Sequence, residues 1–284
     1  MNPLNNLSST ILLIDCDDEK GLIHKITGVL YKNELNIISN SEFVEKTLNH
    51  FYMRTEIAGD FDRQKVFNEL KDVLPKGTTI RLTSKRKKDI IIMVTKEQHC
   101  LGDILMRNHF NELNANISAV IGNHDTLQDL TSKFNIPFYH VTHIDKSKEE
   151  HEAEILKVME QYKPEFLVLA KYMRILSPSF ISRFENRIIN IHHSFLPAFK
   201  GASPYRQAFE RGVKIIGATA HFVNDSLDEG PIIAQSVIPV AHSHSPSSMA
   251  LAGADVEKIV LAKSLKLVFE ERVFVSRNKT IIFD

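Results

Sequence analysis

Glycine is scarce in this chain of 284 residues, which contains 11 glycines, about 4% against the usual 7% or so. No G-x-G-x-x-G pattern occurs. Gly212 and Gly217 have the outer spacing of a phosphate-binding loop, but Ala218 stands where that loop carries its lysine. These absences argue against ATP and dinucleotide binding.

Cysteine is nearly absent as well. Cys16 and Cys100 cannot form a disulfide framework, so we expect a protein of the reducing cytoplasm. No C-x-x-C or H-E-x-x-H pattern is present. We therefore expect no metal, although one group of histidines is dense enough to consider, namely His192, His193, His221, His242 and His244.

The chain also lacks an excess of either charge and any long apolar run. Lys+Arg and Asp+Glu both number 35, so no global basic field attracts nucleic acid or anionic lipid. The apolar runs are far shorter than the ~20 residues that span a bilayer, and the first ten residues do not resemble a signal peptide. We expect no nucleic-acid partner and no membrane association. The basic run at 85–88 has no interleaved aromatics, which favours a solvated linker over a nucleic-acid patch.

The first 84 residues predict a small α/β unit. Strands are expected at 10–15, 36–44, 49–57 and 78–83. Helical spacing of Leu22, Ile26, Val29 and Leu30 marks the first helix, and a second carries Val66 and Leu70. The resulting order, β-α-β-β-α-β, is that of a ferredoxin-like domain.

The pattern changes after the basic run. Apolar strands are expected at 90–94, 117–121, 138–140, 166–170 and 187–191, and they alternate with helical stretches at 100–113, 126–133, 148–162 and 178–184. This alternation is typical of a Rossmann-like, mostly parallel sheet covered on both faces. Long antiparallel strands at 213–223 and 231–240, a helix at 255–271 and a strand pair at 273–283 follow. We therefore divide the chain into domains at 1–84 and 89–284, joined by a linker at 85–88.

The segment NIHHSFLPAF (190–199) follows an apolar strand. Asn190 and His192 stand two residues apart at the carboxyl end of that strand, where open α/β sheets bind their ligands. An amide and an imidazole on one side of a strand are suited to stabilising an oxyanion. A polar strand exit, with Asn190 serving a turn and His192 solvated, fits this segment equally well.

The loop at 224–231 is acidic and ends in Gly-Pro, which fixes a turn. A carboxylate held there beside a histidine would orient the imidazole and handle a proton from water. Simple solvation of an acidic hairpin loop is the alternative.

Four segments together resemble the 10-formyltetrahydrofolate-dependent formyltransferase family. They are KYMRILSPSF (171–180), NIHHSFLPAFKGASPY (190–205), GATAHFV (217–223) and LDEGPIIAQ (227–235). The resemblance implies that Asn190, His192 and Asp228 are catalytic. It also implies folate contacts from two segments, at Arg174, Ile175 and Leu176 and at Val223, Asn224 and Leu227.

The N-terminal unit resembles an ACT-type regulatory domain. Its turn at 18–23 is similar to the one at which such domains often bind amino acids, which implies an effector site at Asp18, Gly21, Leu22 and Ile23. The resemblance also implies a homo-oligomer. Oligomerisation without effector binding is the alternative for this domain.

The residues that follow the first strand of the second domain bear on the formyl acceptor. Transformylases that act on a ribonucleotide carry a glycine-rich phosphate turn there, whereas residues 95–102 contain no paired glycine and include Glu97. In the transformylases a proline usually follows the catalytic histidine, whereas His193 stands at that position here. We therefore expect water to attack, with Asp228 orienting or deprotonating it, and no cofactor besides the folate substrate. The products would be formate and tetrahydrofolate. The resemblance implies that this formate feeds purine synthesis and that the reaction balances the one-carbon pool. The alternative is formyl transfer to a small amine.

Overall fold

The computed structural model describes residues 9–198 and 204–284. These residues form two compact units. One comprises the described residues up to Arg86 together with Phe283 and Asp284, and the other runs from Lys87 to Ile282. Each unit is described by itself below.

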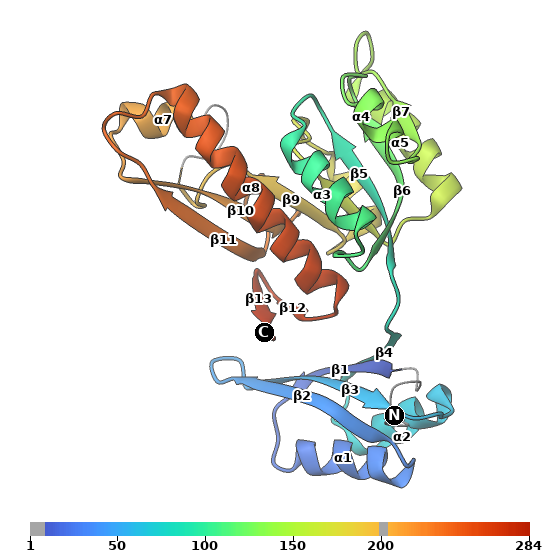
Figure 1. Cartoon of the computed structure of the whole chain (residues 1–284). Helices are drawn as coiled ribbons and strands as arrows, with labels where there is room; N and C mark the ends of the chain where they lie inside the picture. The colour runs from blue at the N-terminus through green and yellow to red at the C-terminus, as the bar shows by residue number, and fades with distance from the viewer. Residues whose placement is uncertain (1–8, 199–203) are drawn as a thin grey trace. The chain divides into compact units, whose positions relative to one another are not determined.

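The N-terminal unit is a four-stranded antiparallel sheet with two helices. Its elements are β1 (Ser9–Asp17), α1 (Leu22–Lys32), β2 (Asn36–Glu45), β3 (His50–Ala58), α2 (Arg63–Val73) and β4 (Thr79–Ser84). The strand order is β2-β3-β1-β4, and α1 and α2 lie on the same face of the sheet (Figure 1). The predicted β-α-β-β-α-β order is confirmed.

Side-chain periodicity explains this packing. Leu12 and Ile14 of β1 alternate toward the helices and join Ile26 of α1 and Leu70 of α2 in one buried core. The Asp62 side chain accepts hydrogen bonds from the backbone N–H groups of the first turn of α2 and so caps it.

The C-terminal unit contains a seven-stranded sheet in the order β11-β10-β9-β8-β5-β6-β7. The five strands from β9 to β7 are parallel. Strand β10 runs in the opposite direction and pairs antiparallel with both β9 and β11. The strands are β5 (Lys88–Val94), β6 (Ala115–Gly122), β7 (Phe138–His140), β8 (Phe166–Leu169), β9 (Ile188–His192), β10 (Ile215–Phe222) and β11 (Ile232–Pro239), and a separate pair is formed by β12 (Val273–Ser276) and β13 (Lys279–Ile282).

Helices cover both faces of this sheet. They are α3 (His99–His109), α4 (Gln128–Ser132), α5 (Lys148–Tyr162), α6 (Pro178–Ile181) with the short turn η2 (Ser182–Phe184), α7 (Pro204–Glu210) and α8 (Pro246–Phe269). Ile90 and Ile92 of β5 point to a core shared with α3 and α8, whereas Ile91 and Met93 point to a core shared with α5 and α6. The expected mostly parallel sheet with covered faces is confirmed.

Two helical segments differ from the sequence prediction. Helix α8 begins at Pro246, nine residues before the predicted start, because Ser245 caps it and its first turns carry too many serines and small residues to give an apolar period. Helix α7 was not predicted.

The predicted linker at 85–88 extends one residue too far. Lys88 is the first residue of β5, and its ammonium lies 2.5 Å from the Glu271 carboxylate.

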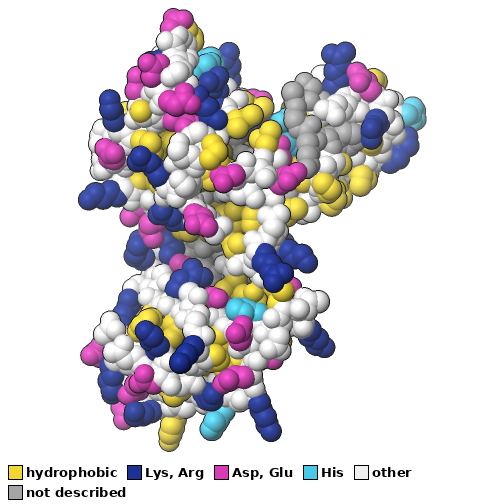
Figure 2. All heavy atoms as spheres, turned by 180° about the vertical axis from the view of Figure 1, so that it is seen from behind, with side chains coloured by type: hydrophobic (Ala, Val, Ile, Leu, Met, Phe, Trp, Pro, Cys, Tyr) yellow, Lys and Arg dark blue, Asp and Glu magenta, His cyan; other side chains and the backbone are white. Residues whose placement is uncertain are grey.

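The visible surface carries charges of both signs. On the face seen in Figure 2, basic and acidic side chains are interspersed, in keeping with their equal numbers in the sequence. No helix in residues 9–198 and 204–284 combines the length and the apolar composition needed to cross a bilayer.

Candidate active site

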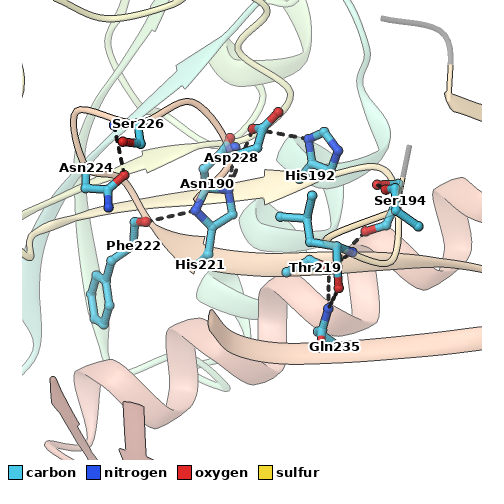
Figure 3. A network of polar contacts seen from close by, with 12 residues as sticks. Asn190, His192, Ser194, Thr219, His221, Phe222, Asn224, Ser226, Asp228 and Gln235 are labelled. Atoms are coloured by element: carbon cyan, nitrogen blue, oxygen red, sulfur yellow. Dashed lines mark hydrogen bonds and ion pairs between the residues drawn. The ribbon is translucent and has the colours of Figure 1, made fainter. Parts of the chain in front are cut away.

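The carboxyl end of β9 carries the two polar side chains singled out in the sequence. Asn190 and His192 lie two residues apart on this strand and so point to the same side. The antiparallel register with β10 sets His221 directly opposite Asn190, and Thr219 opposite His192. The pairing of two strands thus brings an amide and two imidazoles together (Figure 3).

His192 is held by a carboxylate from a distant loop. Its Nδ1 lies 3.3 Å from Oδ1 of Asp228, so Nδ1–H donates to that oxygen. The other ring nitrogen, Nε2, is buried and has no hydrogen-bond partner among the described residues. Because a buried polar atom without a partner is costly, such an atom points to a function. Nε2 of His192 is therefore available to a bound substrate.

The loop after β10 presents Asp228 in a constrained conformation. Asp228 has φ +57°, in the left-handed region that non-glycine residues seldom occupy and that clusters at functional sites. Asn224 Oδ1 accepts a hydrogen bond from Ser226 N at 3.2 Å. A Cβ on Gly230 would come within 1.8 Å of the Phe222 carbonyl oxygen, so only glycine allows the loop to close this tightly.

A chain of hydrogen bonds fixes the Asn190 amide. His221 Nδ1 lies 2.8 Å from the Phe222 carbonyl oxygen, so this nitrogen carries the proton and donates it. His221 Nε2 is then an acceptor, and Asn190 Nδ2 donates to it at 3.2 Å. The same Nε2 lies 3.9 Å from Asp228 Oδ1. Since Asn190 carries two amide hydrogens, one remains for a ligand.

Electrostatics separate the protonation states of these groups. Burial alone would raise the pKa of Asp228, but the hydrogen bond and charge of His192 outweigh it and lower that pKa. Burial lowers the pKa of His221. Burial, followed by the charge of Lys171, lowers the pKa of His193 to about 4. At neutral pH the site therefore holds an ionised Asp228 and a neutral His193.

These side chains face a pocket of about 300 Å³. It lies at the carboxyl ends of β8 and β9. Strands β6 and β7 are added on one side of β5, and β8 and β9 on the other, so the strand order reverses next to the pocket. Open α/β sheets bind their ligands at such a point. Exposed Met173, Ile175 and Leu227 provide apolar surface at the pocket. All nine residues predicted as catalytic or folate-contacting line it: Asn190, His192, Asp228, Arg174, Ile175, Leu176, Val223, Asn224 and Leu227.

The pocket segment after β8 is anchored at both ends. Met173 N donates to Thr95 Oγ1 at 2.9 Å. Ser177 N donates to Glu152 Oε1 at 2.7 Å, and the Ser177 hydroxyl also bonds to the buried Glu152 carboxylate. These bonds hold the backbone of 173–177 in place against the pocket.

The loop after β9 is pinned from two neighbouring strands. Thr219 Oγ1 accepts from Leu196 N at 3.0 Å and donates to the Ser194 carbonyl at 2.9 Å. Gln235 of β11 donates to the Leu196 carbonyl at 3.0 Å. Figure 3 shows Thr219 and Gln235 beneath the loop that carries Ser194.

A second polar cluster lies next to the pocket, around the buried Glu257 of α8. His99 Nε2 lies 2.8 Å and Lys171 Nζ 3.3 Å from Glu257 Oε2, and the Tyr205 hydroxyl donates to Oε1 at 2.6 Å. Burial alone would raise the pKa of Glu257, but these partners outweigh it and lower that pKa to about 2. Lys171 also lies 3.5 Å from Glu97.

Part of this cluster has the donor types of a metal site. Ligand atoms of His99, Cys100 and Glu257 lie within 4.8 Å of one another. However, the Lys171 ammonium already neutralises the carboxylate, and burial raises the pKa of Cys100, so its thiol stays protonated. The arrangement fits an internal ion pair better than a cation site.

Sequence reasoning missed the role of His221 and the whole Glu257 cluster. His221 was considered with the histidines that could hold a metal, and of that group His242 and His244 lie beyond β11 instead of at the pocket. The register between β10 and β9, which places His221 opposite Asn190, is visible in the structure but not in the sequence. Glu257 belongs to none of the quoted motifs, and the resemblance assigned no role to Lys171, the first residue of KYMRILSPSF.

The predicted effector residues lie at the start of α1. Gly21 precedes the helix with φ +91°, a conformation that favours glycine. Leu22 is buried and Ile23 is 43% exposed. Asp18 N donates to the Asn49 carbonyl oxygen at 2.8 Å, which ties this turn to the end of the β2–β3 connection.

Comparison with known proteins matches both units. The formyl transferase family matches residues 88–265 and the ACT domain family matches residues 10–75. A formyltetrahydrofolate deformylase of Haemophilus influenzae is 53% identical over 276 residues, which cover 97% of this chain and 99% of that protein. The chain belongs to the formyltetrahydrofolate deformylase family.

Solved structures agree with this membership. The formyltetrahydrofolate deformylase of Pseudomonas syringae matches with a TM-score of 0.95 at 39% identity, over 99% of this chain and 96% of that one. A glycinamide ribonucleotide transformylase of Symbiobacterium toebii matches with a TM-score of 0.67 at 27% identity, over 70% of this chain and 95% of that one. The deformylase family therefore accounts for the full chain, and the transformylase for a part of it.

Proposed function

We propose that the protein hydrolyses 10-formyltetrahydrofolate to formate and tetrahydrofolate. The observation that supports this most strongly is Nε2 of His192, which has no hydrogen-bond partner among the described residues and lies at a pocket that also holds Asn190 and Asp228. Membership of a deformylase family over the whole chain supports the same reaction. The test is incubation with 10-formyltetrahydrofolate alone: formate and tetrahydrofolate should appear in equal amounts.

His192 and Asn190 stabilise the oxyanion in this proposal. Asp228 holds Nδ1 of His192, so a protonated His192 directs Nε2–H toward the formyl oxygen. The second hydrogen of the Asn190 amide, the one that His221 does not accept, donates to the same oxygen. Two such donors stabilise the tetrahedral intermediate most when they are already positioned before the reaction.

Asp228 receives the proton of the attacking water. Its carboxylate lies at the pocket and is ionised at neutral pH because its pKa is lowered. Water adds to the formyl carbon, the bond to N10 breaks, and N10 takes up the proton. Asp228 therefore acts both on water and, through its hydrogen bond, on the orientation of His192.

The folate ring binds against the anchored segment and the loop after β10. Exposed apolar side chains, Ile175 and Leu227 among them, offer a surface for a flat ring. Arg174 supplies a positive charge at the same pocket for an anionic substrate. The fixed backbone at 173–177 supports hydrogen bonds to the edge of the ring.

Formyl transfer to a small amine is the alternative, because transformylases share the fold of the C-terminal unit. A phosphorylated amine in the pocket would find the Lys171 ammonium already paired with the carboxylates of Glu97 and Glu257. This charge pattern disfavours an anionic acceptor. Formate release that depends on an added amine, or a formylated amine as the product, would favour transfer instead.

We further propose that the N-terminal unit binds a small amino acid at Asp18, Gly21, Leu22 and Ile23 and thereby regulates a homo-oligomer in the cytoplasm. The match to the ACT domain family supports a small-molecule effector. Calorimetry with methionine and with glycine tests the idea, and the absence of binding heat for both would count against it. The formate released would feed purine synthesis.

A further inference from the structure

His193 is the one histidine at the pocket without a hydrogen bond of its own in the described part of the chain. It lines the pocket beside Asn190, His192 and Asp228, and its ring centroid lies 5.3 Å from that of His192. Neither of its ring nitrogens has a hydrogen-bond partner among the described residues, and the ring is only half-buried. Its nitrogens are therefore free to meet a molecule in the pocket.

The surroundings of His193 favour a small neutral molecule. Behind it, Tyr205 packs with its ring centroid 6.0 Å away and bonds to Glu257. Lys171, which also lines the pocket, is 3% exposed and neutralised by Glu257 and Glu97. Among the described residues, the charges of this cluster are paired with one another, so the cluster offers no unpaired cation to a phosphate.

A neutral imidazole has one donor and one acceptor nitrogen. Burial of the ring, followed by the nearby charge of Lys171, lowers the pKa of His193, so the neutral ring can accept a hydrogen bond from water at neutral pH. Water at this position would lie between His193 and the Asp228 carboxylate, which share the pocket.

We propose that His193 is a catalytic residue that holds the water molecule attacking the formyl carbon, and that it thereby commits the site to hydrolysis. This rests on the function proposed above. An oxygen lone pair of the water forms the new C–O bond, and Asp228 takes the proton that the water loses. The C–N10 bond then breaks, N10 keeps the electron pair and takes up that proton, and the formic acid released ionises to formate.

The experiment compares wild type, His193→Phe and His193→Asn with two nucleophiles. Phenylalanine keeps the ring but has no nitrogen, while asparagine restores a hydrogen-bonding group. Formate release from 10-formyltetrahydrofolate measures attack by water. Formohydroxamate formed with added hydroxylamine measures attack by a stronger nucleophile that has less need of His193.

We expect His193→Phe to lower kcat for hydrolysis by about 10²-fold, the lower end for a group that assists proton transfer, with KM changed by less than about twofold. The kcat of His193→Asn for hydrolysis should be at least about tenfold higher than that of His193→Phe. Hydroxylamine attack should fall far less than hydrolysis in His193→Phe.

Hydrolysis by His193→Phe at the wild-type rate would overturn the proposal. So would an equal loss of both reactions, because the ring would then only shape the site. A wild-type enzyme that releases no formate would instead refute the proposed function itself, a result distinct from either of these.

Discussion

Oδ1 of Asp228 lies 3.3 Å from Nδ1 of His192, although one residue belongs to a loop and the other ends a strand. The left-handed backbone of Asp228 and the close approach permitted by Gly230 hold the carboxylate in this position. The contact leaves Nε2 of His192 without a hydrogen-bond partner in the part of the chain that the structure describes. A carboxylate beyond reach of His192 would have ruled out this arrangement.

Asp228→Asn tests the proton acceptor. The amide keeps the size of the side chain but cannot take a proton from water, so we expect kcat to fall by about 10²–10³-fold. Substrate binding, measured by fluorescence titration with a folate analogue, should change little. A fully active Asp228→Asn enzyme would show that another group is the base.

His221→Phe tests the positioning of Asn190. The substitution removes the acceptor of the Asn190 amide, and we expect kcat to fall about tenfold. Asn190→Ala should lower kcat by about 10²–10³-fold, as does loss of an oxyanion donor. If His221 acts through Asn190, the double variant will be more active than the product of the two single effects predicts. Independent effects would assign His221 a separate role.

A pair of glycines in helices tests the packing around the Glu257 cluster. A Cβ on Gly253 of α8 would come within 2.0 Å of the Tyr205 hydroxyl oxygen, whereas a Cβ on Gly102 of α3 would meet nothing within 4 Å. Gly253→Ala should lower the free energy of unfolding by about 1–3 kcal/mol. Gly102→Ala should raise it by about 0.5–1 kcal/mol. Urea unfolding of both variants checks the contrast, and equal effects would contradict it.

His193 makes stability depend on pH. The unfolded residue binds a proton below about pH 6.5, whereas the folded residue does so only near pH 4. Between these values the unfolded chain binds more protons, so stability falls as the pH falls. From pH 7 to pH 5 the wild type should lose about 2 kcal/mol more than His193→Phe does. Parallel losses in urea unfolding would mean that His193 is protonated in the folded protein.

Local patterns in the sequence predicted most of the fold. Leu22, Ile26, Val29 and Leu30 recur at helical spacing and all are buried in α1. The start of α8 was not predictable in this way, because its first residues pack through small side chains such as Gly253 and carry no apolar period. Helix α7 has only seven residues, too few to establish a period.

Only those residues of the candidate site that belong to short sequence motifs could be predicted. The spacing of Asn190 and His192 indicated a shared side of one strand, and the resemblance supplied Asp228. His221 depends on the register between β9 and β10, which no local pattern encodes. The Lys171–Glu257 pair joins the end of β8 to the middle of α8, and such long-range contacts arise only when the sheet and helix pack together.

The origin of the oxygen atoms in formate distinguishes hydrolysis from formyl transfer. The enzyme is given 10-formyltetrahydrofolate in H₂¹⁸O without any amine, and the formate is analysed by mass spectrometry. Hydrolysis through Asn190, His192 and Asp228 predicts formate that carries one ¹⁸O atom, released together with an equal amount of tetrahydrofolate. Formate that appears only when an amine is added, or that carries no ¹⁸O, would show that the enzyme does not hydrolyse its substrate with water.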